Sequence, residues 1–244
     1  MTFNQSYIFD RSGIAALSDL KTPQWCELFE ILENEQKIFL ERESEFRSTE
    51  YKWPRDPLHT WSRIWEYPYV YYHLRRWREK STNITDILHV VDLGSGVTFF
   101  PFSVARLGYK VTCTDIDPVC KIDLERAIKK IDHKPGEVEF RMGEELKLPF
   151  CDSEVDAVYC ISVLEHIPTF DSTLEEIGRI LKPEGLLILT IDLDLRGDSE
   201  LGVDKYEYLY SLLRKNYIFT YPEITIYPAD ILFSTSGPYS VTAP

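Results

Sequence analysis

The chain has 244 residues, of which 44% are hydrophobic and 14% aromatic, enough to bury the core of one α/β domain with an extension. Its 40 acidic residues outnumber its 27 lysines and arginines, so the formal net charge is -13. Because this charge repels a phosphate backbone and an anionic membrane surface, we expect neither a nucleic acid nor a membrane as a partner.

The first residues and the cysteines bear on the compartment. Residues 1–17 lack the basic and apolar regions of a secretory signal, and no apolar run approaches the roughly 20 residues that span a bilayer. The cysteines are odd in number and include no C-x-x-C pair, which argues against a disulfide framework and a zinc site. We therefore expect a cytoplasmic protein with no bound metal.

The first predicted element is one long helix over residues 22–46. Apolar residues such as Trp25, Leu28 and Leu32 recur there at helical spacing among glutamates. Prolines in residues 54–57 then break the chain.

A strongly aromatic stretch follows at residues 61–77, where we predict a helix that is interrupted or kinked near Pro68. So many aromatic side chains must pack on something. They either bury the N-terminal helix against the main domain or form a lid over a ligand, and both roles are compatible. We therefore assign residues 1–85 to a helical N-terminal cap or lid.

From residue 86 onward, short apolar runs alternate with helical segments, the pattern of βαβ units and a parallel sheet. The predicted strands cover residues 88–93, 110–114, 138–142, 155–161 and 186–192. The predicted helices cover residues 100–107, 119–131, 173–181 and 206–215, and irregular strands or loops cover 217–239. The fold class is α/β: a Rossmann-like, mostly parallel sheet of about seven strands flanked by helices, with an aromatic-rich helical cover.

The strongest local motif is Val90-Val-Asp-Leu-Gly-Ser-Gly96, an apolar strand that runs into a glycine turn. Such a turn lets a ligand approach the backbone at the carboxyl end of a strand, although it can also be purely structural. The next strand ends at Asp115, which can accept hydrogen bonds from both hydroxyls of a ribose. Thr98 and Phe99 stand where a pyrophosphate loop needs small residues, so a cofactor without pyrophosphate fits better.

Five motifs follow one another between residues 88 and 194. They are Val91-Asp-Leu-Gly-Ser-Gly96, Val111-Thr-Cys-Thr-Asp-Ile-Asp-Pro118, Gly143-Glu-Glu-Leu-Lys-Leu-Pro-Phe150, Val155-Asp-Ala-Val-Tyr-Cys-Ile-Ser-Val-Leu-Glu-His-Ile167 and Leu181-Lys-Pro-Glu-Gly-Leu-Leu-Ile188. In these motifs and their order the chain resembles the class I S-adenosylmethionine-dependent methyltransferases, in particular their small-molecule branch. The resemblance implies S-adenosylmethionine as the cofactor, a small-molecule acceptor, and residues 86–244 as the cofactor-binding catalytic domain.

The resemblance also implies which residues hold the cofactor. Gly94 and Gly96 would lie beneath its methionine part, with Asp92 near its amino group. Asp115 would bind its ribose. The third glycine of the family is Thr98 here, which leaves the detailed pose of the methionine part open.

The same resemblance places further residues around the adenine and the cofactor's methionine end. Ile116 would flank the adenine, and Glu144 stands where the family usually has an aspartate beside the adenine amino group. Ile161 and Ser162 would line the cofactor after the fourth strand.

Methyl transfer from a sulfonium is an in-line displacement, so the protein must mainly align the acceptor away from water and sometimes remove a proton. His166, directly after the fourth strand, is a candidate general base, although a structural role at a helix start is the alternative. If the aromatic stretch is a lid, Arg63 and Tyr67 reach the cofactor carboxylate.

A second wall of the acceptor site is a weaker hypothesis. Loops after strands often shape specificity on such folds, and Tyr227, Asp230 and Tyr239 lie in the last segment. Ordinary surface positions are the alternative for all three.

We expect transfer of a methyl group to an oxygen or nitrogen atom of a small metabolite. One alternative is an enzyme that uses S-adenosylmethionine for cyclisation or aminocarboxypropyl transfer, suggested by the unusual loop at residues 98–101. Others are a non-catalytic regulatory protein that retains the cofactor pocket and a nicotinamide oxidoreductase. The oligomeric state stays open, with a homodimer among the options.

Overall fold

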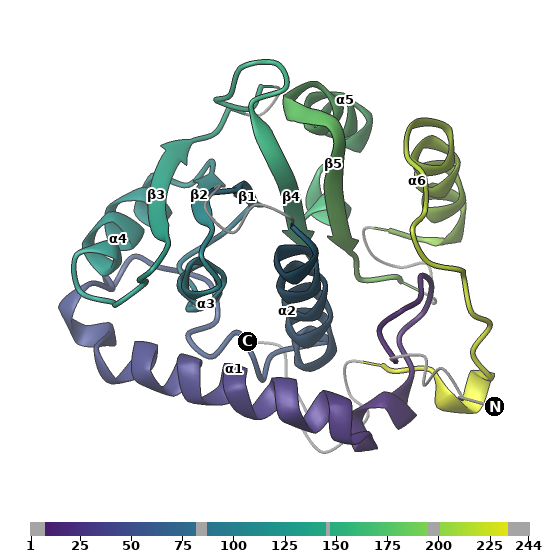
Figure 1. The fold of residues 1–244 in the computed structure, drawn as a ribbon, viewed down its shortest axis with the longest axis horizontal. Coiled ribbons are helices and arrows are strands. Elements are labelled where there is room, and N and C mark those ends of the chain that lie inside the picture. The colour runs from purple at the N-terminus through teal and green to yellow at the C-terminus, as the bar shows by residue number, and fades with distance from the viewer. Residues whose placement is uncertain (1–7, 82–86, 145–146, 195–200, 234–244) are drawn as a thin grey trace.

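The computed structural model describes residues 8–81, 87–144, 147–194 and 201–233. Within these residues the chain forms a five-stranded parallel sheet in the order β3-β2-β1-β4-β5, with helices on both faces (Figure 1). The strands are β1 (His89–Leu93), β2 (Lys110–Asp115), β3 (Glu137–Met142), β4 (Val155–Ile161) and β5 (Leu181–Thr190). The α/β class is confirmed, and the described residues hold five of the roughly seven strands expected.

The helices cover the sheet and line its carboxyl edge. They are α1 (Pro23–Glu41), α2 (Arg63–Lys80), α3 (Phe100–Arg106), α4 (Pro118–Ile128), α5 (Phe170–Ile180) and α6 (Val203–Asn216). Short 3-10 turns are η1 (Leu17–Lys21), η2 (Glu43–Glu45), η3 (Leu164–His166) and η4 (Pro228–Asp230). In the described part of the chain, no helix combines the length and apolar character that crossing a membrane requires.

The two faces of the sheet belong to different hydrophobic clusters, because successive side chains of a strand point in opposite directions. One face, with Val90 and Tyr159, packs with residues of α1, α2, α3 and α4. The other, with Val91 and Val158, packs with residues of α5 and α6. The N-terminal helices therefore share a core with the sheet.

Helix α1 starts where the sequence predicts and ends earlier. The Thr22 hydroxyl accepts a hydrogen bond from the Trp25 N–H, and a proline at the first helical position suits this start. The helix ends at Glu41, so the prediction of one helix to residue 46 is wrong. No apolar residue occupies positions 41–45, and the chain turns so that Phe46 packs on Phe39, with ring centroids 4.8 Å apart.

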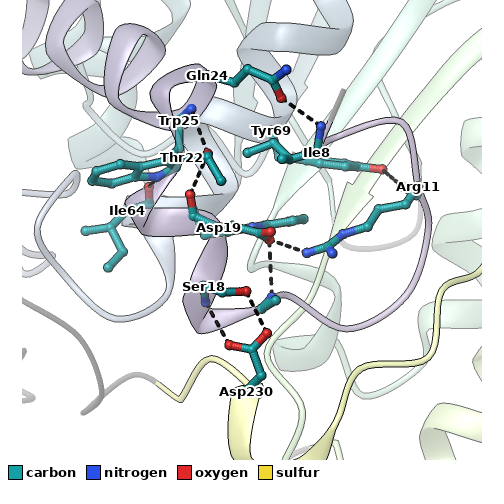
Figure 2. Close-up of polar contacts among 12 residues, drawn as sticks. Ile8, Arg11, Ser18, Asp19, Thr22, Gln24, Trp25, Ile64, Tyr69 and Asp230 are labelled. Atoms are coloured by element: carbon teal, nitrogen blue, oxygen red, sulfur yellow. Dashed lines mark hydrogen bonds and ion pairs between the residues drawn. The ribbon is translucent and has the colours of Figure 1, made fainter. Parts of the chain in front are cut away.

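We predicted an interruption or a kink near Pro68, but helix α2 runs through this residue and the interruption does not occur. Proline has no N–H to donate to the carbonyl oxygen of Ile64, one turn earlier. That oxygen instead accepts the indole N–H of Trp25 at 2.8 Å (Figure 2). A side chain of α1 thus replaces the missing backbone donor of α2.

Strand β5 also departs from the prediction, because it begins at Leu181 and not at residue 186. Leu181 pairs with Val155, and the next paired residues are Leu186 and Ala157. The Pro-Glu-Gly turn expected before the strand therefore forms an irregularity inside it. Other elements differ from the prediction by a few residues at their ends.

The C-terminal segment lies beside the N-terminal one. Ser12 bridges Glu223, and Ala16 bridges Ile231. Over residues 217–233 the structure has isolated bridges and η4, in agreement with the irregular segment expected there. Tyr239 lies outside the described residues.

Candidate functional site

Strand β1 leads into a tight turn whose two glycines, Gly94 and Gly96, have φ of +70° and +53°. Glycine adopts such values without strain. The N–H groups of Gly94 and Ser95 donate to the Thr114 carbonyl oxygen at 2.9 and 3.1 Å. A methyl group on Gly94 would lie 2.6 Å from both methyl carbons of Val163. The turn is therefore fastened to the end of β2 and requires glycine.

The Asp115 carboxylate, half-buried at the end of β2, reinforces this turn. Its Oδ2 accepts the Gly96 N–H at 3.0 Å, and its Oδ1 accepts the Asp117 N–H at 2.9 Å. A carboxylate offers about four acceptor positions, so about two remain for ligand hydroxyls.

Two further predicted residues lie at the same edge of the sheet. Ile116 follows β2 directly and its side chain is 61% exposed. Glu144 is exposed just after β3, and the N–H of Gly143 before it donates to the Asp115 carbonyl oxygen at 3.0 Å. The structure therefore brings Asp115, Ile116 and Glu144 together.

Asp92 is a buried residue of β1 that lies opposite Tyr159 of β4. Burial raises the pKa of the Asp92 carboxyl to about 8, and the negative charge of Asp115 adds to the rise. The raised pKa favours the protonated carboxyl, which can donate as well as accept a hydrogen bond.

The aromatic stretch divides between core and site. Tyr67 is buried, with its ring stacked on Phe100 at a centroid distance of 4.7 Å. The Arg63 guanidinium lies over the Trp61 ring at 4.6 Å. Its Nη1 is buried, and within the described part of the chain it has no hydrogen-bond partner. A buried guanidinium nitrogen of this kind suits a ligand carboxylate.

At the end of β4, buried Ile161 leads into Ser162, whose φ of +48° is rare outside glycine and typical of functional sites. The Ser162 N–H donates to the Thr190 carbonyl oxygen at 3.1 Å. Its hydroxyl lies 2.8 Å from both carboxylate oxygens of Glu66 in α2. This contact ties the N-terminal cover to the strand end.

Sequence reasoning did not select Glu66, which is 3% exposed. Burial and the nearby charge of Asp192 raise its pKa to about 7, while Arg63 opposes the rise. Its signal in the sequence is that it is the one acidic residue of the aromatic stretch 61–77. Tyr51 was also missed: its hydroxyl accepts the Val97 N–H at 3.1 Å, and nothing in its surrounding sequence indicated this.

The residues directly after β4 differ in exposure. The predicted base, His166, is exposed in η3, and its role stays a prediction. Its neighbour Glu165 is 6% exposed, and its Oε1 accepts the Asp192 N–H at 2.9 Å. Burial raises the pKa of Glu165 to about 8.

Of the proposed second wall, Asp230 accepts hydrogen bonds from the backbone and hydroxyl of Ser18 at 2.8 and 2.6 Å, and Tyr227 is 84% exposed. Two surface hollows, of about 520 and 420 Å³, lie elsewhere. The larger is formed by α6 and residues 219–223, and the smaller by α1 with Asp56 and His59. Neither includes a residue of the glycine turn.

Comparisons with known proteins agree with this geometry. Residues 91–189 match the family model described as a methyltransferase domain. Over 128 residues the chain is 30% identical to a ubiquinone biosynthesis O-methyltransferase of Xanthomonas oryzae, covering 51% of each chain. Over 126 residues it is 32% identical to a ubiquinone/menaquinone biosynthesis C-methyltransferase of Nitrobacter hamburgensis, covering 50% of this chain and 48% of that one.

The crystal structure of the cyclase SpnF has the same fold, with a TM-score of 0.50 and 20% identity over 84% of this chain and 74% of that one. The chain spans about half the length of the curated relatives it matches. The family match contains the glycine turn, Asp115 and the end of β4. The chain therefore carries a class I S-adenosylmethionine-dependent methyltransferase domain, formed by residues 91–189.

Proposed function

We propose that this chain transfers a methyl group from S-adenosylmethionine to an oxygen or nitrogen atom of a small molecule. One observation carries the proposal. The segment that matches the family holds both the glycine turn and Asp115, and the Gly96 N–H joins them at 3.0 Å. They meet at the carboxyl edge of the sheet, where open α/β folds bind ligands.

The residues at this edge fit the cofactor in charge and shape. Arg63 Nη1, which has no hydrogen-bond partner among the described residues, suits the cofactor's carboxylate, and Asp115 keeps acceptor positions for its ribose. The tight turn at Gly94 lets the methionine part of the cofactor approach the backbone closely. When bound, the cofactor supplies an electrophilic methyl group on a sulfonium.

The protein's own contribution is to hold the acceptor in line with that methyl group and to exclude water. We propose that residues 1–85 act as the cover and residues 86–244 as the catalytic domain. The contact of α2 with β4 and β5 supports the role of residues 1–85 as a cover packed on the sheet. His166 remains our candidate for a base on the exposed side.

The relatives' names support a small-molecule acceptor, since one is an O-methyltransferase and the other a C-methyltransferase of quinone biosynthesis. The methylated atom in this chain is our proposal. The cysteines of the described residues are all free, which supports the reducing cytoplasm as the compartment.

Two measurements test the proposed function. Calorimetric titration with S-adenosylmethionine and S-adenosylhomocysteine should give binding, while NADH, the control ligand, should not bind. Incubation with S-adenosylmethionine and candidate acceptors should yield S-adenosylhomocysteine and methylated product in equal amounts. Formation of methylthioadenosine would indicate cyclisation or aminocarboxypropyl transfer and would contradict methyl transfer. Absence of cofactor binding would overturn the proposal.

A further inference from the structure

Three carboxyl side chains gather where β4 and β5 end. They form what we call the carboxyl cluster: Glu66, Glu165 and Asp192. Glu66 comes from the first turn of α2, Glu165 from η3 after β4, and Asp192 from the chain leaving β5. Since β4 pairs with β1, the cluster lies beside the strand that carries the glycine turn.

Within the described residues, neutral groups donate the hydrogen bonds that hold the cluster. The Ser162 hydroxyl lies 2.8 Å from both oxygens of Glu66, and the Ser62 hydroxyl lies 2.5 Å from Asp192 Oδ1. The Asp192 N–H donates to Glu165 Oε1 at 2.9 Å. These bonds fix the carboxyl groups in place without balancing their charge.

Among the described residues, carboxyl groups outnumber basic groups in this part of the site. Arg63 is the cation whose charge acts on Glu66, whereas Glu165 is influenced by Glu66 and Asp192. Glu66 and Glu165 are 3% and 6% exposed. Burying carboxylates without matching cations is costly, so the empty cluster holds protons near neutral pH, and a ligand of positive charge would favour the ionised carboxylates.

An unpartnered polar atom provides a second observation. Glu165 Oε2 is buried, and within the described part of the chain it has no hydrogen-bond partner. The buried hydroxyl of Thr190 lies on the other side, toward the Glu66 carboxylate, where hydrogen bonding lowers the pKa of that group. Buried polar atoms are nearly always satisfied, so Glu165 Oε2 indicates a polar ligand.

We propose that the carboxyl cluster binds the amino group of the acceptor, so that the substrate is an amine held as its ammonium ion. This inference rests on the proposed function. An ammonium group supplies the positive charge and the N–H donors that Glu165 Oε2 and its neighbours lack.

The cluster can also accept the proton that the ammonium group must lose before its nitrogen is methylated. The bound ammonium transfers one proton to a carboxylate of the cluster, which frees the nitrogen lone pair. The lone pair attacks the methyl carbon, the C–S bond breaks, and its electron pair stays on sulfur as a thioether. The product is a methylated ammonium ion, and the carboxyl group later returns its proton to water. Burial raises the pKa of Glu66 and Glu165 to about 7 and 8, which suits a proton acceptor near neutral pH.

Calorimetry on the full chain saturated with S-adenosylhomocysteine tests this inference. The probes are benzylamine, phenethylamine and cyclohexylamine, each paired with the alcohol of the same carbon skeleton. We expect at least one amine to bind about tenfold more tightly than its alcohol. Glu66→Gln should reduce that preference about tenfold, whereas Glu175→Gln, at an exposed position of α5, should leave it unchanged.

The outcomes separate the inference from the function on which it rests. Failure of S-adenosylhomocysteine to bind the unaltered chain would overturn the proposed function. If it binds while no amine is preferred over its alcohol, the amine assignment alone is wrong. A Glu66→Gln variant that binds S-adenosylmethionine more weakly, but S-adenosylhomocysteine normally, would place the cluster against the sulfonium and also overturn the inference. Retained S-adenosylhomocysteine binding shows that the variant is folded.

Discussion

Asp115 serves both the turn and the proposed ligand, because its oxygens hold the N–H groups of Gly96 and Asp117. Asp115→Ala removes the charged acceptor that we assign to the ribose. We expect S-adenosylhomocysteine to bind more weakly by about 1–3 kcal/mol, the scale of a hydrogen bond to a charged group. Calorimetric titration measures the change.

Two variants separate ligand binding from support of the turn. Asp115→Asn keeps an acceptor oxygen for the Gly96 N–H and should fall between the Ala variant and the unaltered chain. Asp117→Asn should leave affinity unchanged, because asparagine also caps a helix such as α4. Equal affinity of Asp115→Ala and the unaltered chain would show that the ribose lies elsewhere.

The conformation of a single glycine gives a second test at this scale. Gly94 has φ of +70°, and a Cβ there would meet Val163 at 2.6 Å. We expect Gly94→Ala to lower the free energy of unfolding by about 1–3 kcal/mol, measured by urea denaturation.

Gly178 is the matched control. It lies inside α5, and a Cβ there would meet the Tyr217 hydroxyl oxygen at 3.7 Å, an ordinary contact. Gly178→Ala should therefore raise the free energy of unfolding by about 0.5–1 kcal/mol. If both variants shifted stability in the same direction, backbone conformation would not be the cause.

Among the elements, the pair α1 and α2 depends on the Trp25 indole N–H bound to the Ile64 carbonyl oxygen. Trp25→Phe leaves that buried oxygen without a donor, because Pro68 cannot supply one. We expect a loss of about 1–3 kcal/mol of unfolding free energy in addition to the loss of packing. Urea denaturation measures it.

A double-mutant cycle isolates the hydrogen bond from the packing. Pro68→Ala restores a backbone N–H that can reach the Ile64 carbonyl oxygen, so Trp25→Phe should cost about 1 kcal/mol less in that background. Additive losses would mean that the indole stabilises α2 only through its apolar contacts.

The elements also show what local sequence can predict. Strands β1 to β4 were predictable because each is a short apolar run bounded by turn residues. The continuity of α2 was not, since the donor that replaces the Pro68 N–H comes from α1, far away in the sequence. The start of β5 was missed because Leu181 pairs with Val155 before the Pro-Glu-Gly turn.

The candidate site likewise has parts that local sequence predicts and parts that it does not. The glycine turn and Asp115 were predictable from one βαβ unit, because their positions follow from adjacent strands. The carboxyl cluster was not, because Glu66 reaches Ser162 only after α2 packs on the ends of β4 and β5. Long-range packing of this kind leaves no periodic signal in the sequence.

At the scale of the whole molecule, contacts around η1 join the two ends of the described chain to α2 (Figure 2). The buried Asp19 carboxylate accepts the Trp65 indole N–H at 2.8 Å and forms an ion pair with Arg11. Its neighbour Ser18 binds Asp230 of the C-terminal segment. Contacts from both ends of the described chain, through Arg11 and Asp230, therefore stabilise η1.

Buried carboxyl groups should make the stability of the whole molecule depend on pH. Burial raises the pKa of Asp92, Glu66 and Glu165 to about 8, 7 and 8, from ordinary values near 4. Between these limits the folded chain binds protons that the unfolded chain has released, so stability falls as pH rises. His73, whose pKa burial lowers to about 4, acts in the opposite direction, but only below its ordinary value of 6.5.

Between pH 6.5 and 8 the contribution of His73 no longer opposes that of the carboxyl groups. We therefore expect the free energy of unfolding to decrease steadily as the pH rises across this range. Glu165→Gln should flatten the decrease, because the amide keeps an oxygen for the Asp192 N–H and has no proton to lose. Glu175→Gln, at an exposed position, should retain the full slope. Urea denaturation at several pH values measures all three proteins. An unchanged slope in the Glu165 variant would mean that this carboxyl does not carry its proton in the folded chain.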